Sequence, residues 1–190
     1  MQFTLARPDA VRAINQRWLL KFWSRHLDGG RTPRWQTVKA DDLASMADNL
    51  SFLDVTADTP PRFMIRFHGR LIARAQGTGD CRGRCLDEIL PPARRPDVLA
   101  PYVQAVRTGA PVYTIQHLND SGGRLIHFER LLLPFSRDGE AVDRILGAFE
   151  FVCADGDFDV HELMNAAGRT PVLRLSATID VPELAPAKDS

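Results

Sequence analysis

Residues 111–154 read PVYTIQHLNDSGGRLIHFERLLLPFSRDGEAVDRILGAFEFVCA, in which three apolar stretches are separated by two short polar turns. The apolar stretches cover residues 111–118, 124–135 and 142–154. The second turn contains Asp138-Gly139, a pair that favours the tight turn of a β-hairpin. Consecutive strands joined by short turns pair antiparallel, so this segment predicts a three-stranded antiparallel meander.

Two shorter strands are predicted upstream of this meander. They are NLSFLDVT at 49–56 and RFMIRFHG at 62–69, which read as a hairpin. The second strand alternates strictly, so Phe63, Ile65 and Phe67 are expected to share one face of the sheet.

Helical patterns lie on both sides of the predicted hairpin. After it, residues 70–77 and 83–90 read as short helices, and residues 97–108 read as a longer helix with Asp97 as its N-cap. Before it, a short helix opens at Asp41-Asp42. Because strands and helices do not alternate one for one, a doubly wound parallel sheet is not expected.

The clearest helical pattern covers residues 8–28, where Pro8 suits the first helical position. Its apolar residues recur at three- and four-residue steps and form a stripe. The stripe consists of Val11, Ile14, Trp18, Leu19, Phe22 and Trp23. It is expected to cover either the chain's own sheet or a second copy of the protein. A membrane surface is the third possibility, which the flanking Asp9 and Asp28 disfavour.

Composition is that of an ordinary soluble domain. The chain has 190 residues, of which 44% are hydrophobic and 25% charged, and this length predicts one domain. Lys and Arg number 24, as do Asp and Glu, so no overall charge attracts nucleic acid or a membrane. Three cysteines and no apolar run of membrane-spanning length indicate a cytoplasmic protein.

The order of elements resembles a PAS domain, and the local sequence resembles the small stand-alone bacterial PAS-type proteins of the fifth PAS family. The likeness extends over residues 10–155. It is carried by FMIRFHG at 63–69, GRCLDEIL at 83–90, FERLLLP at 128–134, DRILGAFEF at 143–151 and Asp54. His68 and Arg70 stand where the family would have an apolar and a small residue, so the lip of the pocket differs here.

The resemblance implies an α+β fold: a PAS-like five-stranded antiparallel sheet with short helices on one face and an amphipathic N-terminal helix. It divides the chain into an N-terminal helical cap at 1–48, a PAS-like core at 49–155 and a partly flexible C-terminal extension at 156–190. Within that extension, residues 172–179 are either a further strand or a docked segment, and residues 181–190 are expected to fray. The implied role is sensory or signalling, without a named ligand.

Known cofactor and catalytic motifs are not found in the sequence. Cys81 and Cys85 lack the further ligands that zinc requires, and Cys81 lacks the surrounding motif of photosensory flavin domains. The helix at 97–108 contains no histidine, which a haem PAS domain would use as axial ligand. No nucleophile elbow, phosphate-binding loop or metalloprotease motif occurs, so we predict no metal, no identifiable cofactor and no enzymatic activity.

Three charged residues, Arg66, Glu129 and Glu150, stand in strongly apolar strand sequence. Each would face water on the outer side of the sheet, form a buried Arg–Glu pair, or, for Arg66, hold a carboxylate or phosphate in a pocket. The alternation of a strand does not decide between these possibilities.

Three functional hypotheses follow. The first is a sensor whose core pocket binds a small molecule, and its ligand-binding residues would be Phe63, Ile65, Arg66, Phe67, Tyr102, Glu129 and Phe149. The second is a homodimerisation or docking module, with the stripe from Val11 to Trp23 as interface and an unknown signalling protein as partner. The third is an enzyme on a cone-shaped α+β fold, for which His127 and Glu129 are too far apart to form a dyad.

Overall fold

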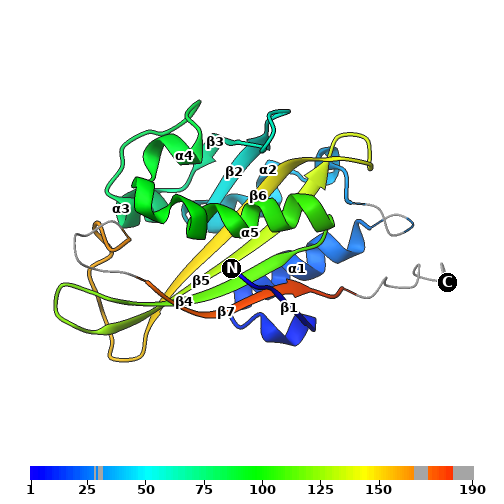
Figure 1. The fold of residues 1–190 in the computed structure, drawn as a ribbon. Coiled ribbons are helices and arrows are strands. Elements are labelled where there is room, and N and C mark those ends of the chain that lie inside the picture. Colours follow the sequence, from blue (N-terminus) through cyan, green and yellow to red (C-terminus); the bar gives the residue numbers. More distant parts are fainter. Residues whose placement is uncertain (28, 30–31, 165–170, 182–190) are drawn as a thin grey trace.

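The computed structural model describes residues 1–27, 29, 32–164 and 171–181, and in these ranges it has one seven-stranded sheet with helices on both faces (Figure 1). The strands are β1 (Thr4–Ala6), β2 (Leu50–Val55), β3 (Phe63–His68), β4 (Val112–Asn119), β5 (Leu125–Ser136), β6 (Val142–Cys153) and β7 (Val172–Ile179). The α-helices are α1 (Ile14–Arg25), α2 (Ala40–Leu43), α3 (Arg70–Gln76), α4 (Leu86–Ile89) and α5 (Arg95–Thr108). Short 3₁₀ helices are η1 (Pro8–Ala10), η2 (Trp35–Thr37), η3 (Ala44–Asn49) and η4 (Pro92–Arg94).

The strand order is β1-β7-β4-β5-β6-β2-β3. The predicted meander of β4, β5 and β6 and the predicted hairpin of β2 and β3 are confirmed, since all of these neighbours pair antiparallel. The prediction of five strands is wrong, because β7 pairs antiparallel with β4, and β1 adds parallel to β7. Strand β1 has only three residues, partly exposed, and therefore no alternating pattern to reveal it.

The two faces of the sheet pack against different helices. We call the face covered by α3, α4 and α5 the inner face, and the opposite one the α1 face (Figure 1). In β5, Phe128 and Leu132 pack with inner-face clusters, whereas Leu131 and Leu133 pack with α1. Alternation along β5 therefore sends successive side chains into two separate cores.

Helix α1 is shorter than the pattern at 8–28 predicts. Residues 8–10 form η1, the chain is extended at Val11 and Ala13, and the α-helix begins at Ile14. The extended stretch allows Val11 to be completely buried in the core, while the helix packs Leu19 beside it. Residue 28, at the predicted end, lies outside the described residues, as do residues 182–190 of the predicted tail.

A β-bulge in the β2–β3 hairpin changes which residues of β3 share a face. Phe52 pairs with Phe67 and Leu53 pairs with Ile65, so Arg66 is the extra residue. The rings of Phe67 and Phe52 lie 5.8 Å apart, and Phe52 packs against the α1-face core. The prediction that Phe67 shares a face with Ile65 is therefore wrong, because a bulge interrupts the alternation on which it rests.

The inner-face helices follow the sequence closely. Gly77 ends α3 and Gly109 ends α5, both with positive φ, as expected for glycines that follow a helix. Helix α5 begins at Arg95, two residues before the predicted N-cap Asp97.

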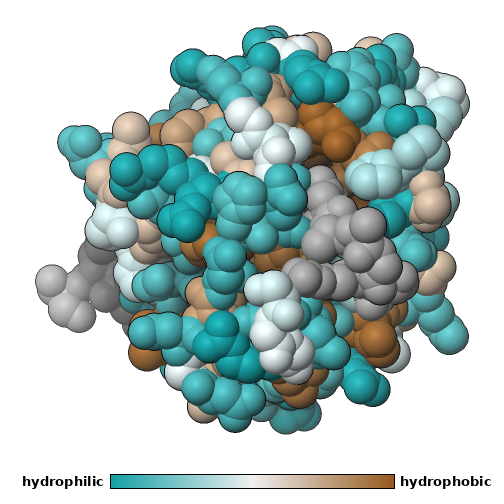
Figure 2. All heavy atoms as spheres, turned by 90° about the vertical axis from the view of Figure 1, so that its left-hand side faces the viewer, coloured by the Kyte–Doolittle hydropathy of each residue, from teal (hydrophilic) through white to brown (hydrophobic). Residues whose placement is uncertain are grey.

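In the described part of the chain, no helix is long and apolar enough to cross a membrane. The end of the molecule that carries α3 and the β4–β5 turn presents mainly hydrophilic residues, with hydrophobic ones in separate patches (Figure 2). Scattered patches of this kind are normal on a folded surface.

Candidate functional site

The inner face contains polar side chains in a region that is otherwise an apolar core. These are Ser51, His68, Gln76, Thr114, Gln116 and Arg130, all buried except His68, which is partly exposed. Their neighbours include Phe63, Ile145 and Leu132, which are almost fully buried. Apolar surroundings with a few inward polar groups are the usual lining of a small-molecule site. The best-formed hollows of the described residues lie elsewhere, beside Leu20, Leu99 and Val106, so a ligand here would have to open the packed core.

Arg130 is the most unusual of these residues, with only 2% of its surface exposed. Its Nε donates to Thr114 Oγ1 and its Nη1 to the carbonyl oxygen of Val98, both at 3.2 Å. The Tyr102 ring centroid lies 5.4 Å from the guanidinium carbon. No carboxylate of the described residues pairs with Arg130, and its buried Nη2 has no hydrogen-bond partner there.

The electrostatics around Arg130 are those of a cation removed from water. Burial lowers the pKa of Arg130. Burial also lowers the pKa of Arg94, and the nearby charge of Arg130 lowers it further. The pKa of Tyr102 is raised by burial, an effect that the positive charge of Arg130 and a side-chain hydrogen bond between the two residues oppose. The charge of Arg130 therefore acts on a second guanidinium group, that of Arg94, near the start of α5.

A second polar pair lies at the junction of β3 and α3. His68 Nε2 and Gln76 Oε1 are 3.0 Å apart, and burial lowers the pKa of His68, so its neutral form is favoured. His68 Nδ1 is buried without a hydrogen-bond partner among the described residues. The sheet is closely packed beside this pair, since a Cβ at Gly147 would meet the Phe149 ring at 2.8 Å and Ser51 Oγ at 3.0 Å.

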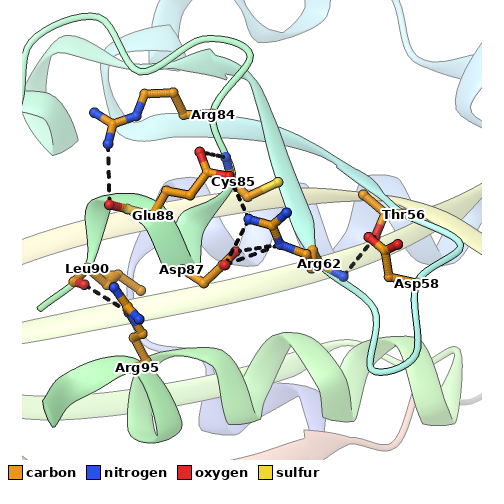
Figure 3. A network of polar contacts seen from close by, with 9 residues as sticks. All are labelled: Thr56, Asp58, Arg62, Arg84, Cys85, Asp87, Glu88, Leu90 and Arg95. Carbon is orange, nitrogen blue, oxygen red and sulfur yellow. Dashed lines mark hydrogen bonds and ion pairs between the residues drawn. The ribbon is translucent and has the colours of Figure 1, made fainter. Parts of the chain in front are cut away.

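Helix α4, one wall of the inner face, is attached to the β2–β3 hairpin by a polar network (Figure 3). Arg62 Nη2 donates to Asp87 at 2.9 Å and to Glu88 at 2.6 Å. Glu88 also accepts from the backbone N–H of Cys85, which precedes the helix. These side-chain contacts add to the backbone hydrogen bonds of Ile65 with Gly83 and Arg84, which hold the start of α4 against β3.

Another polar cluster lies on the α1 face, directly behind Arg130. Tyr113 donates its hydroxyl hydrogen to Glu129 Oε2 at 2.6 Å, and Glu129 is only 4% exposed. Burial, followed by the hydrogen bond to Glu129, raises the pKa of Tyr113. Gln16 of α1 donates from Nε2 to the carbonyl oxygens of Glu129 at 3.2 Å and Ala148 at 2.9 Å. The helix is thus hydrogen-bonded to the backbone of β5 and β6.

Glu150 extends this cluster on β6, where it pairs with Glu129 across the strands. Its carboxylate accepts from Asn15 at 3.3 Å and from Asn49 at 3.2 Å. Burial raises the pKa of Glu150, and the neighbouring charge of Glu129 adds to the effect. The bond from Asn15 connects this carboxylate to α1.

The structure brings only some of the predicted ligand-binding residues together. Phe63, Ile65, Tyr102 and Phe149 lie in the inner-face cores. The other three do not lie there. Arg66 is exposed and pairs with Asp54, Phe67 lies beyond the bulge, and Glu129 faces α1.

Sequence reasoning missed Arg130, although it stands directly after Glu129. The available signal was the alternation of Phe128, Arg130 and Leu132 within FERLLLP, which puts an arginine between two core residues of one face. The buried arginine of the sheet is therefore Arg130 rather than Arg66, and it forms no Arg–Glu pair among the described residues.

The predicted interface stripe divides into a buried part and an outer part. Val11, Leu19 and Trp23 are buried in the chain's own core. Ile14 is 76% and Trp18 44% exposed, and the Phe22 ring stacks on Trp18 at 5.5 Å. Ile14, Trp18 and Phe22 form an outer row on α1, separate from the helix face that packs against the sheet.

Free thiols and histidines are the other groups of the described residues that could take part in cofactor chemistry. Cys81 and Cys85 are buried free thiols, and burial raises the pKa of Cys85. His117 and His127 stack with ring centroids 4.3 Å apart. Within the described ranges, no group of three or more potential ligands could hold a metal ion.

Comparisons with known proteins agree with this architecture. Residues 70–152 match the family model described as PAS fold, and no curated protein matches the chain. A solved structure of a Rhodobacter sphaeroides LOV protein is 13% identical with a TM-score of 0.42, covering 63% of this chain and 71% of that one. An RNA-binding light-oxygen-voltage receptor is 19% identical with a TM-score of 0.38, covering 71% of this chain and 37% of that one.

Likenesses this distant carry no argument about ligand or partner, so the assignment rests on the family match and the observed sheet. The match begins at the first residue of α3 and ends within β6, and it includes α5 and the predicted meander. The resemblance to PAS domains that the sequence motifs indicated is thereby confirmed for residues 70–152, which match the PAS fold, and the sheet around them is PAS-like.

Proposed function

We propose that the chain is a cytoplasmic, non-catalytic sensory protein that binds a small molecule at the inner face and transmits this event to α1. Residues 49–155 would be the sensory core, residues 1–48 the responding cap and residues 156–190 a C-terminal extension. An unknown signalling protein would then read the state of the cap. The observation that carries the proposal is the burial of two consecutive β5 residues, Glu129 and Arg130, on opposite faces.

The contacts of these two residues provide a route through the sheet. Arg130 reaches the first turn of α5 through Val98, while the carbonyl of Glu129 accepts a hydrogen bond from Gln16 of α1. A ligand that moved Arg130 would shift the β5 backbone, and this shift would alter the bonds that hold α1. Coupling of this kind requires that the ligand bind more tightly to one conformation of Glu129 and Arg130 than to another.

The experiment is native mass spectrometry of freshly purified protein, with a visible absorption spectrum and amide exchange of α1. We expect an added mass under native conditions that is lost under denaturing conditions. After the bound molecule is stripped by acid and the protein refolded, amides of residues 14–25 should exchange at a different rate. An α5 segment that responds while α1 does not would contradict the transmission route.

A colourless protein with only the chain's own mass would contradict ligand binding, provided that incubation with a small-molecule extract of the host cells adds no mass either. In that case a second candidate function, homodimerisation or docking through α1, would be favoured. The observation that supports it is the outer row of Ile14, Trp18 and Phe22, which is apolar and partly exposed.

A further inference from the structure

Arg130 is the residue of the inner face that packing alone does not explain. A cation removed from water is costly unless an anion accompanies it. Leu132, two residues further along the same face of β5, shows that an apolar side chain suits this surface. The contacts with Thr114, Val98 and Tyr102 supply dipoles, a ring face and the polar side chain of a neutral tyrosine, but no negative charge.

The chain's own carboxylates do not compensate this charge. Glu129 is adjacent in sequence but faces α1, where its carboxylate accepts from Tyr113. Asp97 is exposed in the first turn of α5 and acts on Arg94 rather than on Arg130. Nη2 of Arg130 consequently remains a buried donor without an acceptor among the described residues.

The surroundings indicate which kind of anion would fit. Phe128 and Leu132 flank Arg130 on β5, and Phe149 is its cross-strand neighbour on β6. A single free guanidinium nitrogen among aromatic and aliphatic side chains suits one carboxylate group attached to an apolar body. Inorganic phosphate would bring more oxygens and charge than the described donors satisfy.

Resting on the sensory function proposed above, we infer that Arg130 anchors the carboxylate of a small organic acid beside the first turn of α5. The free Nη2 would donate to a carboxylate oxygen, and the apolar body would pack against the aromatic rings of the inner face. Arg94, one helical turn before Val98, would lie on the outer side of the same anion and add a second positive charge.

Hexanoate and benzoate are the probes, with hexanamide, benzamide and inorganic phosphate as comparisons. The full chain is titrated by calorimetry, and Arg130→Met is compared with Arg66→Met, which alters an exposed arginine of the neighbouring hairpin. We expect at least one carboxylate to bind the wild type and Arg66→Met equally. The corresponding amide should bind the wild type about tenfold or more weakly than the carboxylate does. The carboxylate should bind Arg130→Met more weakly by the same factor, which is the usual loss for a hydrogen bond to a charged group.

The melting temperature separates a binding role from a structural one. If Arg130 serves binding, Arg130→Met should melt at the same or a higher temperature, because methionine removes a buried unpaired charge. The inference is overturned if neither carboxylate binds, if acid and amide bind equally, if phosphate binds more tightly, or if Arg130→Met binds like the wild type. Should Arg130→Met fail to fold, the acid-to-amide comparison in the wild type decides.

The same samples distinguish failure of this inference from failure of the sensory function. A carboxylate that binds through Arg130 without changing amide exchange in residues 14–25 supports the anchor and contradicts transmission. A native adduct that changes exchange in α1 but survives in Arg130→Met supports the sensor and contradicts the anchor.

Discussion

At the scale of single residues, the polar cluster behind Arg130 contains two acidic side chains that face each other across β5 and β6. The Glu129 carboxylate accepts a hydrogen bond from the Tyr113 hydroxyl, and the Glu150 carboxylate accepts hydrogen bonds from the side-chain amides of Asn15 and Asn49. Burial raises the pKa of Glu150 above its ordinary value of 4.5. Folding therefore favours the protonated form of Glu150, because the cost of burying its charge exceeds the gain from the hydrogen bonds of Asn15 and Asn49.

We expect Glu150→Gln to stabilise the protein at pH 7. Because the folded-state pKa is raised, the stability that Glu150 contributes is present below pH 4.5 and is lost as the pH rises through the folded-state pKa. The amide is neutral at both pH values and has no such loss, so the variant should have the larger free energy of unfolding at pH 7. Urea denaturation at pH 7 and pH 4.5 measures this difference.

The advantage of Glu150→Gln over the wild type should shrink at the lower pH, where the wild-type carboxylate is protonated. Glu140→Gln, at an exposed turn position, is the matched control and should change little at either pH. An equal effect of Glu150→Gln at both pH values would mean that the carboxylate's charge is not what opposes folding.

At the scale of elements, the junction of β3 and α3 depends on a close approach of two backbone segments. Gly69 lies between them, and a Cβ at this position would overlap the backbone carbonyl oxygens of Ala47 and Asp48 in η3. We expect Gly69→Ala to lower the free energy of unfolding by about 1–3 kcal/mol, as overpacking usually does. Thermal denaturation measures this loss.

Gly79→Ala is the matched control, because no heavy atom lies within 4 Å of the Cβ that it would introduce. Both substitutions restrict the unfolded chain in the same way, so their difference isolates the contact at η3. If the two variants melted together, the approach of η3 to Gly69 would not be the constraint that the structure indicates.

Elements with a strong local pattern could be predicted from the sequence, and weakly patterned ones could not. The meander was predictable because β4, β5 and β6 alternate or run apolar between turn residues. Strand β1 is too short to show any period, and it exists only because β7 offers an edge far away in sequence. The bulge at Arg66 is likewise set by pairing with β2, which no feature of β3 alone reveals.

The candidate site was only partly predictable for a related reason, which belongs to the whole molecule. Apolar lining residues such as Phe63 and Tyr102 follow from the expected fold, since most apolar residues of these elements are buried. Charged residues are different, because one step along a strand moves them to the other face. Glu129 and Arg130 differ by that one step, and only the packing of α1 and α5 shows which of them faces the inner core.

The whole molecule also presents the outer row of α1, whose three apolar residues recur every four positions. A row without charged members can pair with its own copy across a twofold axis, in which each subunit offers the same surface. We therefore expect light scattering to give a dimer for the wild type and the monomer mass of 21.2 kDa for Trp18→Glu.

The substitution should not unfold the protein, because the folding side of α1 is the one that contains Leu19 and Trp23, both buried. Lys21→Gln is the control, since Lys21 is exposed on the same helix and its loss lowers the net charge by the same one unit outside the row. If Trp18→Glu were still a dimer, self-association would use another surface. If the wild type were a monomer, the outer row would instead be a surface for binding a different protein. If Trp18→Glu is instead a monomer and α1 also responds to a bound acid, ligand binding and dimerisation would be coupled through α1. The contact that would couple them is the hydrogen bond from Gln16 of α1 to the backbone of β5.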